Sequence, residues 1–139
     1  MSTEHETEPT FQLVLQRIRN RIIEYLELVS SFDDQREYQS GAPVHVPHEV
    51  INQWEDWVRG PRDPAFVQPL FTEEEQDAIA RYHQIWNETA ASTANPLPDL
   101  ESLFLTTEWQ RLRDAAFEAL RVFRVRGKLS EDNEVLARE

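Results

Sequence analysis

Apolar residues in this sequence return every three to four positions in several separate stretches, a spacing that places them on one face of a helix. The longest such stretch runs from Thr10 to Tyr38, and others begin near His48, Glu73 and Thr107. No stretch shows the sustained two-residue alternation that is typical of a half-buried strand. We therefore expect an all-α fold, a single-domain bundle of about four main helices with a short extra helix near Leu100.

Prolines and glycines mark the connections between these stretches. Gly41 and Pro47 interrupt the pattern after the first helix, and Gly60 followed by Pro61 ends the second one. Residues 60–71 hold three prolines among large apolar side chains. This mixture predicts an ordered, proline-rich loop laid over the core rather than a flexible linker.

Helix starts carry capping signals that sharpen the domain limits. Thr72 with Glu75 three residues later is a capping-box pattern, and Thr107 with Gln110 offers a second one. A length of 139 residues suits one hydrophobic core. We expect a helical domain over residues 10–129, between a disordered acidic N-terminus at 1–9 and a frayed, charged tail at 130–139.

The charge balance points to the class of partner. The net charge is −12, from 26 acidic and 14 basic residues, so the chain repels phosphate backbones and attracts basic surfaces. Nucleic acid is therefore not expected as a partner, and a basic protein is. Lys128 is the only lysine, and the 13 arginines favour bidentate pairing with carboxylates inside the fold.

Several kinds of chemistry lack the residues that they need. The chain has no cysteine, which excludes disulfides and thiolate sites, and its three glycines cannot build a glycine-rich phosphate loop. No cofactor is expected. The absence of a long apolar run, together with the polar, acidic first nine residues, predicts no membrane association and a cytoplasmic location.

Histidines supply the main candidates for metal or acid-base chemistry, because adjacent carboxylates such as Asp33 and Asp34 do not converge on a helix. His45, His48 and Glu49 bring two imidazoles and a carboxylate close together in sequence, but Pro47 between the histidines spoils the helical spacing of a zinc motif. His83 falls on an apolar helix face. We expect His48 to be solvated near a helix start and His83 to lie at the edge of the core, so no catalytic residue or metal ligand is assigned.

Tryptophans and carboxylates define the predicted partner face. Of the four tryptophans, we expect three to be buried and Trp57 to be partly exposed, as an aromatic anchor among acidic neighbours. The middle of the chain is its most acidic part. The residues predicted to meet a basic partner are Glu55, Asp56, Trp57, Glu73, Glu74 and Asp77.

These observations rank three functional hypotheses. The first is a non-enzymatic acidic protein-binding module, and one biological form of it is a bacterial immunity protein or antitoxin that neutralises a basic toxin domain. The second is a structural or regulatory helical subunit that forms a homodimer through the first helix, motivated by Leu13 and Ile23 on its opposite face. The third is a small enzyme or metal protein that uses His83 or the His45, His48 and Glu49 group.

Overall fold

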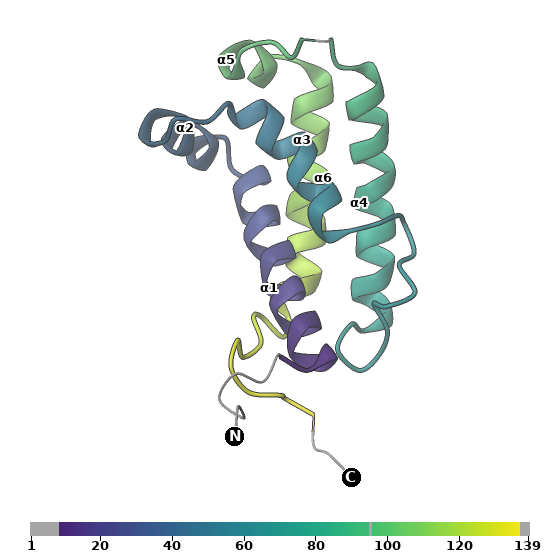
Figure 1. Ribbon diagram of the computed structural model, residues 1–139. Coiled ribbons are helices and arrows are strands. Elements are labelled where there is room, and N and C mark those ends of the chain that lie inside the picture. The colour runs from purple at the N-terminus through teal and green to yellow at the C-terminus, as the bar shows by residue number, and fades with distance from the viewer. Residues whose placement is uncertain (1–8, 95, 137–139) are drawn as a thin grey trace.

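The computed structural model describes residues 9–94 and 96–136, and all the regular structure in them is helical (Figure 1). This confirms the predicted all-α bundle. The helices are α1 (Phe11–Val29), α2 (Phe32–Gly41), α3 (Val46–Trp57), α4 (Glu73–Ser92), α5 (Leu100–Phe104) and α6 (Thr107–Arg124). None of the described helices is both long enough and apolar enough to cross a membrane.

Three long helices form the body of the bundle. In Figure 1, α6 runs antiparallel to α1 and α4, and it packs most extensively against α4 and then against α1. Helix α3 crosses α1, while α2 and α5 cover one end. Ring stacking between Phe32 of α2 and Phe104 of α5, with centroids 4.1 Å apart, joins these two short helices.

Tryptophans fill the core at three of their four positions. Trp54, Trp86 and Trp109 are buried, and only Trp57 keeps part of its surface exposed, as we predicted. Each buried indole donates its N–H to a polar partner, for example Trp109 to the side-chain oxygen of buried Gln35 at 3.0 Å. Buried indoles therefore fix helix positions as well as supplying apolar contact area.

The first predicted helix is in fact two helices. Our prediction of one helix from Thr10 to Tyr38 is wrong, because α1 ends at Val29 and α2 starts at Phe32. The Ser31 side chain caps α2 by accepting a hydrogen bond from the Asp34 amide at 3.1 Å. The corner at Ser30 and Ser31 lets α2 turn away from the line of α1 (Figure 1).

Two other helix starts differ from the sequence expectation by a few residues. Helix α3 begins at Val46, slightly before the expected start near His48, with Pro47 in its first turn, where a missing amide hydrogen costs nothing. Helix α6 is capped by Thr106 and not by Thr107, since the Thr106 side chain accepts from the Trp109 amide at 3.2 Å. The capping box predicted at the start of α4 is present with both of its hydrogen bonds.

The loop between α3 and α4 is anchored to the core, as its composition predicted. Phe66, Leu70 and Phe71 are buried, and the rings of Phe66 and Phe71 stack with centroids 4.4 Å apart. The exposed side chain of Val67 lies between them in sequence. Because buried side chains that anchor the loop alternate with exposed ones, the loop is ordered although it holds three prolines and large apolar side chains.

A buried ion cluster ties α1 and the segment after α6 to the start of α4. Glu75, 1% exposed, accepts hydrogen bonds from fully buried Arg19 of α1 and from Arg126, whose Nη2 lies 2.8 Å from Glu75 Oε1. Arg126 also donates to the Leu70 carbonyl at 2.6 Å. Glu75 thus pairs with two guanidinium groups, and is not available to any partner.

The segment that follows α6 lies along α1 instead of fraying. The Asn20 carboxamide bonds both backbone groups of Leu129, accepting from its amide at 2.9 Å and donating to its carbonyl at 2.7 Å. Gln16 donates to the carbonyl of Ser130 at 2.9 Å. Our expectation of a frayed tail from Ser130 is corrected up to Leu136, because carboxamides on α1 satisfy the segment's backbone.

The remaining terminal predictions fall outside the described part of the chain. Residues 1–8 of the predicted disordered N-terminus are not described, and the same holds for residues 137–139 of the tail. At the described boundary, the Thr10 hydroxyl donates to the Glu134 carboxylate and caps α1 by accepting from the Leu13 amide at 3.2 Å. The beginning of α1 and the end of the described chain therefore lie together.

Candidate binding surface

The predicted partner residues on α3 point to different sides of that helix. Asp56 and Trp57 line a groove between α3 and α1, together with residues from α2. Glu55 lies close enough to His83 of α4 to interact with it electrostatically. Because neighbouring helix positions diverge by about 100°, Glu55 faces α4 while Asp56 faces α1.

The predicted residues on α4 form a separate acidic group. Helix α3 meets α4 at His83. Glu73 lies ten residues before His83, about 15 Å away along the axis of α4. Glu73 and Glu74 are exposed in the first turn of α4, where carboxylates favour the positive end of the helix dipole. Asp77 pairs with Arg62 at 2.8 Å. The six predicted residues are therefore split between surfaces and do not form one patch.

The groove between α1 and α3 brings together carboxylates and aromatic side chains. Its volume is about 540 Å³. Its walls come from the second half of α1, from Tyr38 of α2 and from α3. We call it the α1–α3 groove, and its lining includes Arg21, Glu24, Tyr38, Glu49, Asp56 and Trp57.

The carboxylates of the α1–α3 groove differ in how they are held. Glu49 accepts a hydrogen bond from Gln53 at 2.6 Å, and Glu24 lies 3.0 Å from Lys128 Nζ. Arg21 also holds Glu24: its Nη2 donates a hydrogen bond of 3.4 Å to Glu24 Oε2, and its Nε lies 3.0 Å from Glu24 Oε1 without forming a hydrogen bond. Asp56 is exposed and has no hydrogen bond or ion pair with any residue that the structure describes.

Two partly exposed aromatic side chains border these carboxylates. Trp57 is the last residue of α3, and Tyr38 lies in the second half of α2. An aromatic face beside unneutralised carboxylates suits an arginine or lysine side chain, which gains both ionic and cation–π attraction. The groove is therefore chemically suited to a cationic side chain.

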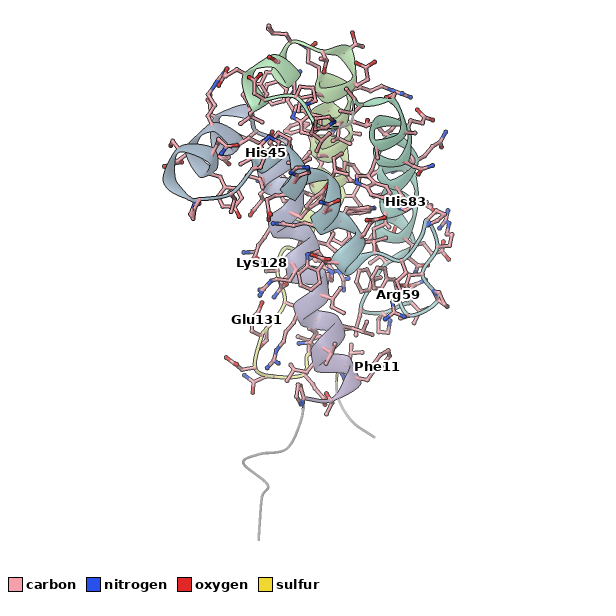
Figure 2. All side chains as sticks on the ribbon, turned by 45° about the horizontal axis from the view of Figure 1, so that its top comes forward. Phe11, His45, Arg59, His83, Lys128 and Glu131 are labelled. Carbon is pink, nitrogen blue, oxygen red and sulfur yellow. The ribbon has the colours of Figure 1, made fainter. Side chains whose placement is uncertain are left out.

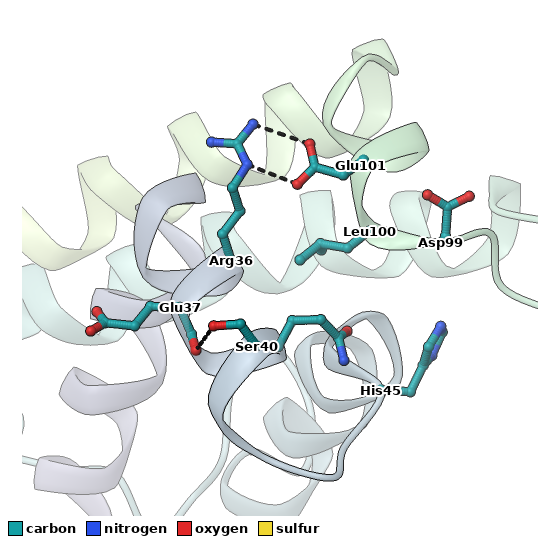
Figure 3. A pocket seen from close by; sticks show the side chains of 8 residues that line it. Arg36, Glu37, Ser40, His45, Asp99, Leu100 and Glu101 are labelled. Atoms are coloured by element: carbon teal, nitrogen blue, oxygen red, sulfur yellow. Dashed lines mark hydrogen bonds and ion pairs between the residues drawn. The ribbon is translucent and has the colours of Figure 1, made fainter.

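A larger groove between α2 and α5 is less suited to an external ligand. It measures about 770 Å³, and Figure 3 shows its two walls, with Arg36 of α2 facing Glu101 of α5. Two hydrogen bonds of 2.8 and 3.2 Å join that pair. Hydrogen bonds from the Ser102 side chain and backbone hold the pKa of Asp99 below its ordinary value. The charges of these residues are already used in contacts that hold α2 and α5 in place.

His83 lies at the core edge, as expected. Its Nδ1 accepts a hydrogen bond from Trp54 Nε1 at 3.0 Å, and its ring lies 5.2 Å from that of Trp86. Burial lowers the pKa of His83, and the Glu55 carboxylate offsets part of that effect. Figure 2 shows His83 on the α4 side of the molecule, away from Lys128. This environment favours a neutral imidazole that joins α3 to α4.

The other two described histidines pair with each other at the start of α3. His45 Nδ1 and His48 Nδ1 lie 3.0 Å apart, and His48 is exposed. Glu49 turns away from them toward the α1–α3 groove. Among residues 9–94 and 96–136, no three histidine, aspartate or glutamate side chains are placed to hold a metal ion.

Comparisons with protein-family models, with curated proteins and with solved structures found no match to this chain. Function must therefore be inferred from the grooves and their charges. Sequence reasoning found Asp56 and Trp57 but missed Glu24, Tyr38 and Glu49. These three come from three different helices, which the corner between α1 and α2 and the packing of α3 on α1 bring together, so no linear spacing signals them.

Proposed function

We propose that this chain is a non-enzymatic acidic protein-binding module, and that its partner is a basic protein which inserts an arginine or lysine side chain into the α1–α3 groove. One observation carries the proposal: Asp56, a carboxylate with no partner in the described part of the chain, stands beside partly exposed Trp57 in a groove. An unsatisfied carboxylate next to an open aromatic ring is the arrangement that a cationic side chain complements.

The charge of the whole chain supports the same class of partner. A net charge of −12 steers a basic protein toward this one and raises the association rate, with an effect that salt weakens. The cationic side chain in the groove would then set the orientation of the complex. The long-range attraction and the contact in the groove therefore both favour a basic protein as the partner.

A bacterial immunity protein or antitoxin is one biological form of such a module. Small size, strong acidity and an arginine-rich but lysine-poor composition suit a protein that neutralises a basic toxin domain. A gene for a basic toxin beside the gene for this chain would favour that form. The binding proposal itself does not depend on it.

Self-association through α1 has less support from the structure. Ile23, one of the two residues that motivated it, is 3% exposed and belongs to this chain's own core. Leu13 is half-buried. The apolar surface that suggested a second contact face is therefore largely used within one chain.

Tryptophan fluorescence can test the proposal. Octa-arginine added to the protein at low salt should change the emission of Trp57, because the other three indoles are buried. The change should saturate, shrink as salt is added, and be lost in Trp57→Phe. Octa-glutamate is the matched control peptide. Equal responses to the two peptides, or an unaltered response in Trp57→Phe, would remove the proposal.

A further inference from the structure

Lys128 already places a cation at the edge of the α1–α3 groove. Its Nζ lies 3.0 Å from Glu24 Oε2, and Glu24 is one of the groove's carboxylates. Figure 2 shows Lys128 and Glu131 on the C-terminal segment beside α1. The chain's only lysine thus makes the kind of contact that we propose for the partner.

The backbone on both sides of Lys128 is fixed to α1. The carbonyl of Gly127 accepts a hydrogen bond from buried Arg19, and both backbone groups of Leu129 are bonded by Asn20. Asn20 and Glu24 are one helical turn apart, so these anchors place the lysine side chain over Glu24. Its position is therefore set by neighbouring anchors and does not depend on the ion pair itself.

The ion pair between Lys128 and Glu24 is more exposed than the buried Arg19 that anchors the same segment. The side chains of Lys128 and Glu24 are 46% and 42% exposed, whereas Arg19 is fully buried. Exposed ion pairs are weak and are screened by salt, so a competing cation can replace one partner. Arg21 remains beside Glu24 Oε1, so exchange at Glu24 Oε2 needs a rotation of the lysine side chain, with the segment's backbone still held in place.

We propose that Lys128 is an internal competitor for the α1–α3 groove, and that a partner's arginine or lysine binds Glu24 by displacing it. This inference rests on the proposed function and adds a regulatory contact to it. Lys128 occupies one carboxylate of the groove while Asp56 stays open, so the first contact forms at Asp56 and the second requires displacement. Removing the lysine charge therefore strengthens binding of a cationic ligand.

Three variants test the competition with octa-arginine as the probe. Lys128→Gln should lower the Kd at low salt by about twofold to fivefold, the range that corresponds to one exposed ion pair. Arg81→Gln, at an exposed position on α4, makes the same change in net charge and should lower the Kd much less. Lys128→Arg should bind as the wild type does. Equal effects of Lys128→Gln and Arg81→Gln would overturn the inference.

A label on the Lys128 side chain distinguishes the competition proposal from the proposed binding function. Reductive ¹³C-methylation keeps the positive charge and labels one side chain, because the chain has one lysine. Addition of octa-arginine should shift the Lys128 methyl signal. If the wild-type protein binds the peptide but this signal does not move, the competition is disproved and the binding function stands. If the wild-type protein does not bind it, both are disproved.

Discussion

Trp54 donates its indole hydrogen to His83, with 3.0 Å between Nε1 and Nδ1, and so joins α3 to α4. Trp54 lies one helical turn before Trp57 on α3. The same Trp54 ring packs against Tyr25 of α1 and Tyr82 of α4. The rotation of α3, which decides that Asp56 faces the groove, is thus set by this buried aromatic cluster.

His83 should make stability depend on pH near neutrality. Burial lowers the pKa of His83 below its ordinary 6.5, so the unfolded chain binds more protons than the folded one in that range. The contribution is complete above about pH 6.5 and is lost as the pH falls toward the lower folded-state value. Urea unfolding of the wild type between pH 5 and 7.5 should show stability rising with pH, with a smaller slope in His83→Gln. Parallel curves would contradict this account of His83.

Glu75 should be the carboxylate on which stability depends most. Glu75→Gln leaves two arginines, one fully buried, without their negative partner, and should cost about 3–5 kcal/mol at neutral pH. Glu74→Gln is the matched control, because Glu74 is the exposed neighbour on the same helix turn, and should change stability by less than about 0.5 kcal/mol. Chemical denaturation gives both values. Similar losses in the two variants would show that the buried cluster is not a main support of the fold.

The same carboxylate predicts how acid destabilises the protein. Burial alone would raise the pKa of Glu75, but hydrogen bonds from Arg19 and Arg126 outweigh it, and the net shift is downward. Stability from this group is therefore present above the ordinary value of 4.5 and is lost as the pH falls through the lower folded-state value. The difference in unfolding free energy between wild type and Glu75→Gln should shrink in that acidic range.

Removing either of two buried tyrosine hydroxyl groups should lower the stability of the protein, but by different amounts. Tyr25 Oη donates to the Val50 carbonyl at 2.6 Å and lies 2.7 Å from Tyr82 Oη. Tyr25→Phe leaves the buried Tyr82 hydroxyl without a partner and should cost about 1–3 kcal/mol, whereas Tyr82→Phe leaves the Val50 bond intact and should cost about 0.5–1.5 kcal/mol. Thermal unfolding of both variants checks the order. A larger loss in Tyr82→Phe would contradict this order.

Hydrogen exchange should reveal a docked C-terminal segment. The amides of Leu129 and Val135 donate to Asn20 and Gln16 of α1, so both should exchange more slowly than amides of an unstructured chain. Gln16→Ala should remove the protection at Val135 and preserve most of it at Leu129. Rapid exchange at both amides of the wild type would restore the original expectation of a frayed tail.

The fold was predictable where local signals agreed with tertiary packing. Helical spacing of apolar residues and the Thr72 cap predicted α4, and the proline-rich loop after Gly60 was expected to be ordered. The corner at Ser31 was missed because apolar spacing continues across it to Phe32. The docking of the tail was missed because Gln16 and Asn20 are polar residues whose burial depends on a partner more than 100 positions away.

The candidate site was predictable only in part for a related reason. Composition and helical position singled out Asp56 and Trp57, which the structure places in the groove. Adjacent Glu55 was grouped with them because sequence alone does not fix which way α3 is rotated. The packing of Trp54 on His83 fixes that rotation, and with it the division of the predicted face into two surfaces.

The most direct test of the account compares charge reversal at these two neighbouring positions. Asp56→Lys and Glu55→Lys are adjacent on α3, both are exposed, and they change the net charge equally, so long-range steering is matched. The account predicts that, for octa-arginine at low salt measured by stopped flow, Asp56→Lys slows association and weakens binding about tenfold, while Glu55→Lys has a much smaller effect. Equal effects of the two substitutions would contradict the claim that the α1–α3 groove receives the cation.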